Sequence, residues 1–200
     1  RRSGLDGGAG RRVIPRGSGR YRGCGRRSAN DRAHLTSLDG RFWRMLFVDW
    51  ADHILAPARS PEGRSHYNGQ RALYLSTSPD GCVLASKRYL TPDDPKRAIY
   101  PVRLVSDRII DLRDKEATAH FAIDVTHRAA EWQTIRATGA PSPTWGISDR
   151  VRALGLHGML YASRTDPTKT HLTLFDWNTP TGAHVAADGV IIVFSRYVHL

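Results

Sequence analysis

The chain has 200 residues, a formal net charge of +11 and 40% hydrophobic residues, which is enough to bury a core and predicts a single domain. Its apolar runs are only a few residues long, which excludes a transmembrane helix. Two cysteines, Cys24 and Cys82, exclude a disulfide framework or a cysteine metal site. No charged start followed by an apolar segment is present, so we expect no secretory signal and a cytoplasmic location.

The charge is unevenly distributed. Residues 1–32 contain ten arginines and two aspartates, a net charge of +8, so the remaining chain carries only +3 of the total. A Gly/Arg-rich segment with few large apolar residues cannot offset its own ordering entropy. We therefore predict a flexible basic leader over residues 1–32 and one folded domain over residues 33–200. The high net charge is then weak support for nucleic-acid binding by the domain.

Local patterns predict four helices. Ser78-Pro79-Asp80 supplies an N-cap, a first-turn proline and an acid. Ser142-Pro143 begins another helix, whose apolar side chains share one face before Gly155 ends it. Trp132 and Trp145 are expected in the core. The expected helices span residues 33–38, 79–90, 115–130 and 142–154.

Strand signals are distributed among these helices. Residues 99–105 and 108–112 form either two strands or one bent strand, and the β-branched run 190–194 predicts a buried strand. The irregular order favours an α+β fold, with a mixed and mostly antiparallel β core and peripheral helices. The other expected strands span residues 41–48, 72–76, 158–163 and 171–175.

The loop that enters strand 72–76 concentrates reactive groups. It contains Glu62, Arg64, His66 and Tyr67 within six residues, and a polar loop leading into a buried strand is a common support for a site. Familiar enzyme motifs are absent from the sequence: there is no H-E-x-x-H, no phosphate-binding G-x-x-x-x-G-K-[ST] and no G-x-S-x-G. No metal site is expected.

Four segments occur in an order that resembles a known family. They are Trp43-Arg44, Gly63-Arg64 followed by Ala72-Leu73-Tyr74-Leu75, S-P-T-W-G-I-S-D at residues 142–149, and G-M-L-Y-A-S-R at residues 158–164 followed by Leu172–Phe175. Together these segments resemble RES-domain proteins, the toxins of bacterial toxin–antitoxin pairs.

The resemblance implies a fold similar to ADP-ribosyltransferase toxins and the consumption of NAD as co-substrate. It also implies an Xre-type antitoxin as partner, with which the chain would form an oligomer, and no membrane association. The ParT-like subgroup, to which the chain looks closest, implies transfer of ADP-ribose to an acceptor protein. Alternatives within the family are NAD glycohydrolase and phosphorylase activity.

Residue by residue, Arg44 matches the family arginine, Ser163 the family serine, and Arg64 the arginine of a Gly-Gly-Arg stretch. The family glutamate has no match, because the helix after Ser-Pro reads D-G-C-V-L-A-S at residues 80–86. Glu62 is the nearest carboxylate that can replace it. The resemblance therefore leaves the catalytic carboxylate open, and an inactive binding module is a further alternative.

Arginine forks suit a pyrophosphate, and we assign Arg44 and Arg64 to it, with Arg41 as a neighbour. Strict strand alternation would place Arg41 and Arg44 on opposite faces. Ser163 would bind a ribose hydroxyl or the nicotinamide amide, and Tyr74 would stack on a ring.

Glu62 would bind ribose hydroxyls or help to deprotonate the acceptor, and His66 would hold a phosphate or act as a base. A reading from another class is an RNA-binding or RNA-cleaving toxin with His66 and Tyr67 at the scissile bond. The unremarkable reading of each residue is a solvated loop charge or a structural side chain.

Overall fold

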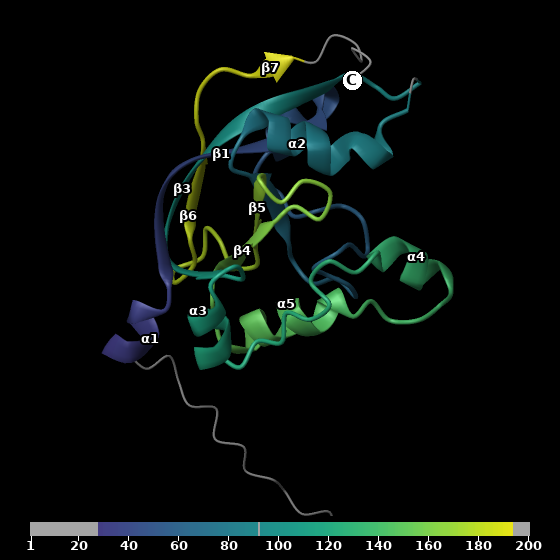
Figure 1. Ribbon diagram of the computed structural model, residues 1–200. Coiled ribbons are helices and arrows are strands. Elements are labelled where there is room, and N and C mark those ends of the chain that lie inside the picture. The colour runs from purple at the N-terminus through teal and green to yellow at the C-terminus, as the bar shows by residue number, and fades with distance from the viewer. Residues whose placement is uncertain (1–27, 92, 194–200) are drawn as a thin grey trace, which may run out of the picture.

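One seven-stranded sheet organises the fold of the computed structural model, which describes residues 28–91 and 93–193 (Figure 1). Its strands are β1 (Thr36–Phe47), β2 (Leu73–Ser76), β3 (Arg97–Asp111), β4 (Gly158–Ala162), β5 (Thr170–Leu174), β6 (His184–Ala187) and β7 (Ile192–Val193). The α-helices are α1 (Ala29–Ala33), α2 (Pro79–Ser86), α3 (Lys115–His120), α4 (Trp132–Ala137) and α5 (Thr144–Ala153), with 3-10 turns η1 (Val48–His53) and η2 (Lys87–Tyr89).

Five strands pair in a closed ring, β1-β2-β5-β4-β3, because β3 also pairs with β1. The β3–β4 pair is parallel and the other pairs of the ring are antiparallel. The short strands β6 and β7 add to β3. The expected α+β class, with a mixed and mostly antiparallel sheet, is confirmed.

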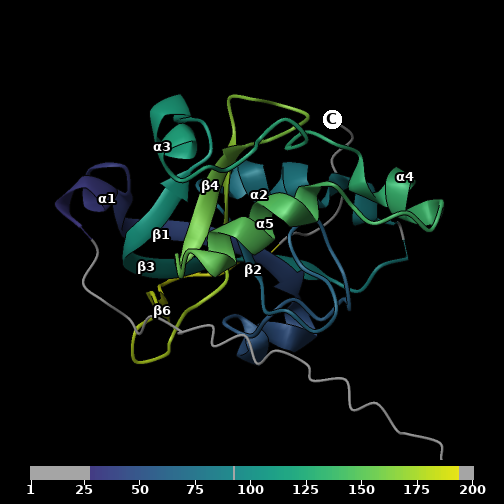
Figure 2. The same cartoon turned by 90° about the horizontal axis from the view of Figure 1, so that it is seen from below.

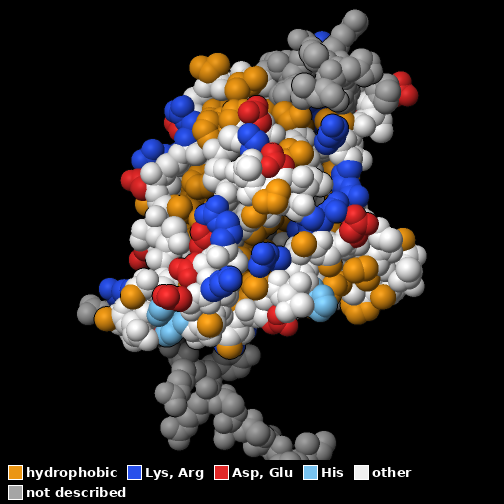
Figure 3. All heavy atoms as spheres, viewed as in Figure 1, with side chains coloured by type: hydrophobic (Ala, Val, Ile, Leu, Met, Phe, Trp, Pro, Cys, Tyr) orange, Lys and Arg blue, Asp and Glu red, His pale blue; other side chains and the backbone are white. Residues whose placement is uncertain are grey.

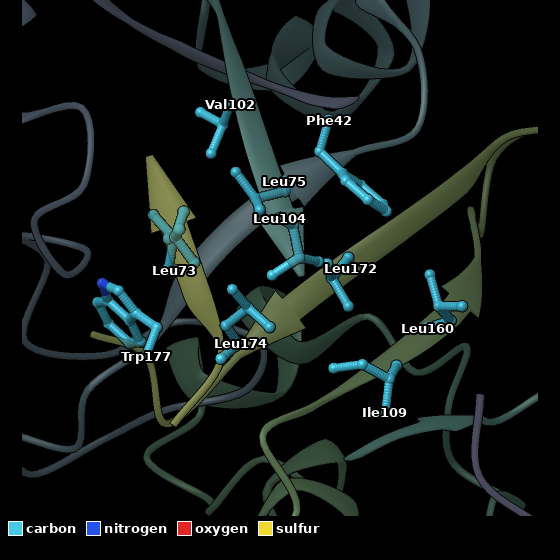
Figure 4. Packing of buried hydrophobic residues seen from close by; sticks show 12 residues of the cluster. Phe42, Leu73, Leu75, Val102, Leu104, Ile109, Leu160, Leu172, Leu174 and Trp177 are labelled. Atoms are coloured by element: carbon cyan, nitrogen blue, oxygen red, sulfur yellow. The ribbon is translucent and has the colours of Figure 1, made fainter. Parts of the chain in front are cut away.

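Alternation along the strands supplies the main core. Leu73 and Leu75 of β2 pack with Leu172 and Leu174 of β5 and with Leu160 of β4, and all five are at most 5% exposed. Figure 4 shows these side chains converging with others from β1 and β3. Burial of each leucine side chain stabilises the fold by roughly 1.5–3 kcal/mol. The cluster therefore fixes which face of β2, β5 and β4 points away from this core.

A second core cluster joins the opposite face of β4, and Phe175 just after β5, to the helices. Ile147 and Val151 of α5 pack with Met159 of β4 and Phe175, beside side chains from α3. Figure 2 shows α5 running across the sheet next to β4. The predicted helix from Ser142-Pro143 is confirmed, and its expected apolar face is the buried one.

Two sequence expectations near the ends of elements are wrong, and for a third the structure decides between two alternatives. Residues 36–38 belong to β1 because they pair with β3, so the helix expected over 33–38 lies earlier, at Ala29–Ala33, where Ser28 caps it. The helix expected over 115–130 ends at His120, and Ala122 has a positive φ of 50°. The two segments 99–105 and 108–112 form one strand, β3, which was one of the two alternatives.

The strand expected to be buried at 190–194 is instead peripheral. Val190 is 88% exposed and only Ile192–Val193 pair with β3, while residue 194 lies outside the described residues. Helix α4 and strand β6 were not expected. Of the predicted leader, residues 1–27 lie outside the described residues, and residues 29–32 are helical. No helix of the described segments is long and apolar enough to cross a bilayer.

We predict that Gly158→Ala destabilises the fold by about 1–3 kcal/mol, the usual cost of overpacking. An added Cβ would overlap the Thr173 carbonyl oxygen and lie 3.0 Å from Leu174 Cα, where β4 meets β5. Urea unfolding at constant slope measures the change. The matched control is Gly146→Ala on α5, whose Cβ would meet nothing within 4 Å and which should be slightly stabilising. Equal midpoints for the two variants would contradict the packing of β4 on β5.

Candidate functional site

A cavity of about 1390 Å³ opens beside the sheet. Its floor comes from β2, β4 and β5, and its walls from η1, the loop 56–66, α2 with η2, and the segment around α4. Of the predicted site residues, the cavity brings together Glu62, Arg64, His66, Tyr74, Ser163 and Arg44. A second hollow of about 400 Å³, near Asp39 and His157, contains none of them.

The lining of this cavity is strongly cationic. Figure 3 shows Lys and Arg side chains gathered on the face between the regions of α2 and α4. Among the described lining residues, one, Glu62, carries a carboxylate, whereas eight carry cationic side chains. Such a lining concentrates anionic ligands. The cations are Arg44, Arg59, Arg64, Lys87, Arg88, Arg97, Arg128 and Arg164.

The floor of the cavity is polar and lies on the face of β2, β4 and β5 opposite to the leucine core. Ser76 and His171 are cross-strand partners on β2 and β5, and Tyr161 of β4 is paired with His171. Ser76 Oγ and His171 Nδ1 lie 2.8 Å apart, and the Tyr161 hydroxyl lies 3.2 Å from Thr173 Oγ1. The register therefore places hydroxyl and imidazole groups, rather than leucines, on this face.

Arg44 is buried at the edge of the cavity and holds its wall. Its Nη1 donates to the carbonyl oxygens of Ile54 and Ala56 at 2.6 and 2.7 Å, and to that of His53 at 3.3 Å. Burial lowers the pKa of Arg44 to about 10, so the guanidinium remains charged at neutral pH. One guanidinium thus joins β1 to the turn after η1.

Arg41 does not reach the cavity, which corrects its expected role beside Arg44. Its side chain is 53% exposed and its Nε donates to Asp188 at 2.8 Å. Three positions separate Arg41 from Arg44 on one strand, so the two side chains point to opposite faces.

His66 and Tyr74 form a closed hydrogen-bonding network. His66 Nδ1 lies 2.8 Å from the Tyr74 hydroxyl and Nε2 lies 2.9 Å from the Ser60 carbonyl oxygen. The Ser65 amide donates to the same hydroxyl. A carbonyl can only accept, so Nε2 carries the proton and Nδ1 accepts from Tyr74. With both ring nitrogens occupied, His66 is arranged to position Tyr74 and the loop.

Tyr67 and its neighbours fasten the same loop to α5. The Tyr67 hydroxyl donates to Asp149 at 2.8 Å, and the ring stacks on Trp145 with centroids 4.4 Å apart. The Trp145 indole donates to the Gly63 carbonyl. Trp145 is buried as expected. An RNA-cleaving pair of His66 and Tyr67 gains no support, because protein partners already hold the reactive atoms of both.

Glu62 and Arg64 flank Gly63 at the entrance. The Glu62 carboxylate accepts from Arg136 Nε at 3.1 and 3.2 Å, and Arg64 Nη1 donates to the Arg128 carbonyl at 3.1 Å. Burial lowers the pKa of Arg64. In the described chain Arg64 uses one of its five donors on the protein, which leaves the rest of the fork for a ligand.

Ser163 lies where β4 leaves the sheet, and it is 7% exposed. Its amide donates to the Lys169 carbonyl at 2.8 Å, and its Oγ lies 3.3 Å from Thr165 Oγ1. Across the cavity, α2 presents Cys82 and Ser86 rather than a glutamate. Burial raises the pKa of the Cys82 thiol to about 12, so this thiol does not replace the missing carboxylate.

The segment around α4 forms an outer wall held by polar contacts. Glu62 pairs with Arg136 and Glu131 with Arg164 at 2.8 Å, while Gln133 donates to the Tyr89 hydroxyl. Helix α4 buries none of its residues. Trp132, expected in the core, is half-buried and lines the cavity instead.

Sequence reasoning missed three floor residues, Ser76, His171 and Tyr161. A signal was present: each occupies the position alternate to a leucine in a strand that was correctly predicted. The pairing of the strands, which brings the three together, was not readable from the sequence. Within the described residues no cluster of His, Cys, Asp or Glu is arranged to hold a metal ion.

Comparison with known proteins adds three findings. The sequence matches the family described as RES domain over residues 41–195. Among the solved structures, a chain of the crystal structure of the M. tuberculosis MbcT-MbcA toxin-antitoxin complex is similar, with a TM-score of 0.53 and 9% identity over 84% of this chain and 93% of that one. At this identity the likeness shows the fold alone. No curated protein matches significantly.

We predict that Arg44→Met lowers the free energy of unfolding by about 3 kcal/mol, because carbonyl oxygens held by a charged donor are left without it. Urea unfolding of the whole chain measures the loss. Arg41→Met is the matched control: it removes an exposed ion pair from the same strand and should barely move the midpoint. The opposite order of effects would contradict the role given to Arg44.

Stability should also fall in mild acid. Burial lowers the pKa of His66, His157 and His171 below the ordinary 6.5. The unfolded chain therefore binds more protons than the folded chain once the pH drops below about 6.5, and the free energy of unfolding decreases there by up to ~1.4 kcal/mol per pH unit for each histidine. Urea midpoints at pH 7.5, 6.5 and 5.5 test this, and His157→Gln should flatten the slope. A midpoint unchanged between pH 7.5 and 5.5 would contradict it.

Proposed function

The chain belongs to the RES-domain family, and on that premise we propose that it is an NAD-consuming enzyme that serves as the toxin of a toxin–antitoxin pair. The observation that carries the proposal is the convergence of Arg64, Tyr74, Ser163 and Glu62, from three separate parts of the chain, on one cavity. Its volume of about 1390 Å³ exceeds the roughly 300–1,000 Å³ of ordinary small-molecule pockets, which leaves room for a dinucleotide and a second reactant.

The lining suits each part of NAD. The open donors of Arg64 match a pyrophosphate, which planar guanidinium groups bind in a bidentate manner. Tyr74 lies on the floor with its hydroxyl already held by His66, so its ring face can stack on a base or on nicotinamide. Ser163 would hydrogen-bond a ribose hydroxyl or the carboxamide. Arg44 is assigned to holding the cavity wall, through the Ile54 and Ala56 carbonyl oxygens, rather than to binding phosphate.

The proposed reaction cleaves the bond between nicotinamide and ribose. The positively charged pyridinium is already a good leaving group, so the protein contributes orientation and an anion near the developing positive charge on the ribose. Glu62 is the carboxylate in the lining that can supply this anion. Its pairing with Arg136 fixes the carboxylate at the entrance.

We further propose that the ADP-ribosyl group is transferred to a cellular acceptor protein, with an Xre-type antitoxin as the neutralising partner. The similar M. tuberculosis structure is a toxin–antitoxin complex, and the cationic face in Figure 3 offers a surface for acidic groups of such a partner. An antitoxin seated there would block entry of the dinucleotide.

Incubation with NAD labelled in its adenylate part separates the possible fates of ADP-ribose. Label retained on a protein of the host extract supports transfer. Free ADP-ribose, or its 1-phosphate when phosphate is supplied, supports degradation of NAD instead. No consumption of NAD under either condition would refute the proposed activity.

We predict that Arg64→Ala weakens NAD binding about 10- to 100-fold, the equivalent of one lost charge-assisted contact of roughly 1.5–3 kcal/mol. Calorimetric titration with NAD measures the affinity. Arg103→Ala is the matched control, because Arg103 pairs with Asp39 on the exposed side of β3. This variant should bind NAD with the affinity of the unmodified chain. Equal affinities of the two variants would remove Arg64 from the site.

A further inference from the structure

His171 and Ser76 form a hydrogen-bonded pair on the cavity floor that the proposed function does not yet use. Ser76 Oγ and His171 Nδ1 are 2.8 Å apart, and both residues line the cavity while being at most 7% exposed. The pair bridges β2 and β5 at matched register. Neither side chain belongs to the residues that the family resemblance supplied.

The second ring nitrogen of His171 has no partner among the described residues. His66 and His157, the other buried histidines, each use both nitrogens on protein groups. His171 uses Nδ1 alone, and the Tyr161 ring lies beside it at a centroid distance of 5.7 Å. Because His171 lines the cavity, its Nε2 is available to a bound molecule.

We propose that His171 is the general base of the NAD cleavage proposed above, on which this inference rests. Its Nε2 accepts the proton of the hydroxyl group, from water or from an acceptor, that attacks ribose C1′. The C1′–nitrogen bond breaks with its electron pair passing to nicotinamide, a C1′–oxygen bond forms, and the hydroxyl proton resides on Nε2 until it is released to solvent. Atoms and charge balance without a further reactant.

Ser76 is the positioning residue in this arrangement. A neutral imidazole carries one proton, so when Nδ1–H donates to Ser76 Oγ, the lone pair of Nε2 is free. We assign this tautomer to His171, because the opposite one, with the Ser76 hydroxyl donating to Nδ1, would place the proton on Nε2 and leave no lone pair there.

The groups around His171 favour its neutral form. Arg64 is the nearby charge, and the titratable neighbours are Tyr161 on β4 and Cys82 on α2 behind Ser76. Burial and the Arg64 charge lower the pKa of His171, so the base is unprotonated at neutral pH. The two other candidates in the lining are less available, since Glu62 is paired with Arg136 and His66 has both nitrogens occupied.

The test is nicotinamide release from NAD by the full chain between pH 5 and 8. His171→Gln should lower kcat about 10²- to 10⁴-fold, leave KM for NAD nearly unchanged and abolish the fall in rate at acid pH. Ser76→Ala should lower kcat less and keep that acid limb, and Ser76→Thr should restore the rate. His184→Gln, an exposed histidine of β6, is the control that should match the unmodified chain.

The outcomes separate the two proposals. An unmodified chain that releases no nicotinamide overturns the proposed function and the base together. Release that persists in His171→Gln, or a loss confined to KM, overturns the base alone. The nitrogen-15 NMR spectrum of the unmodified chain tests the proposal without relying on a variant that could misfold. At pH 7.5 His171 should carry its proton on Nδ1. A proton on Nε2 instead would refute the proposal.

Discussion

Strict alternation of side chains along β2, β5 and β4 is the constraint on which the rest of this structure depends. One face of these strands carries leucines that close the main core, and the intervening positions carry Tyr74, Ser76, His171 and Tyr161. A slip of one residue in register would exchange the two faces. The packing energy of the leucines therefore also fixes the polar floor, and the cavity is placed by the same interactions that stabilise the fold.

The walls are built by a different means. Arg44 holds the turn after η1 through backbone carbonyls, and His66 with Tyr67 fastens the loop 60–70 to β2 and α5. Each of these groups looked like a candidate for chemistry in the sequence. Most of their polar atoms are hydrogen-bonded to other protein groups. Fewer side chains are therefore available to a ligand than the polar loop suggested.

Much of the fold was readable because its strands carry strong local signals. Strands 72–76, 158–163 and 171–175 and the helix from Ser142-Pro143 were predicted close to their observed bounds. The signals failed where tertiary contacts decide: β1 continues back to Thr36 because β3 is long enough to pair with it. Similarly, residue spacing could place Arg41 and Arg44 on opposite faces, but not show which of them faced the cavity. The Ser76–His171 contact required the pairing of β2 with β5, which no local pattern encodes.

The outer wall around α4 has a further consequence. This segment is fastened by pairs such as Glu62–Arg136 and Glu131–Arg164, all partly exposed, and α4 contributes no buried side chain. Exposed ion pairs weaken as the Debye length shrinks from about 10 Å at 0.1 M salt to about 3 Å at 1 M. Ionic strength therefore acts on the closure of the cavity separately from the stability of the leucine core, so the width of the entrance and the integrity of the fold respond to different properties of the surrounding solution.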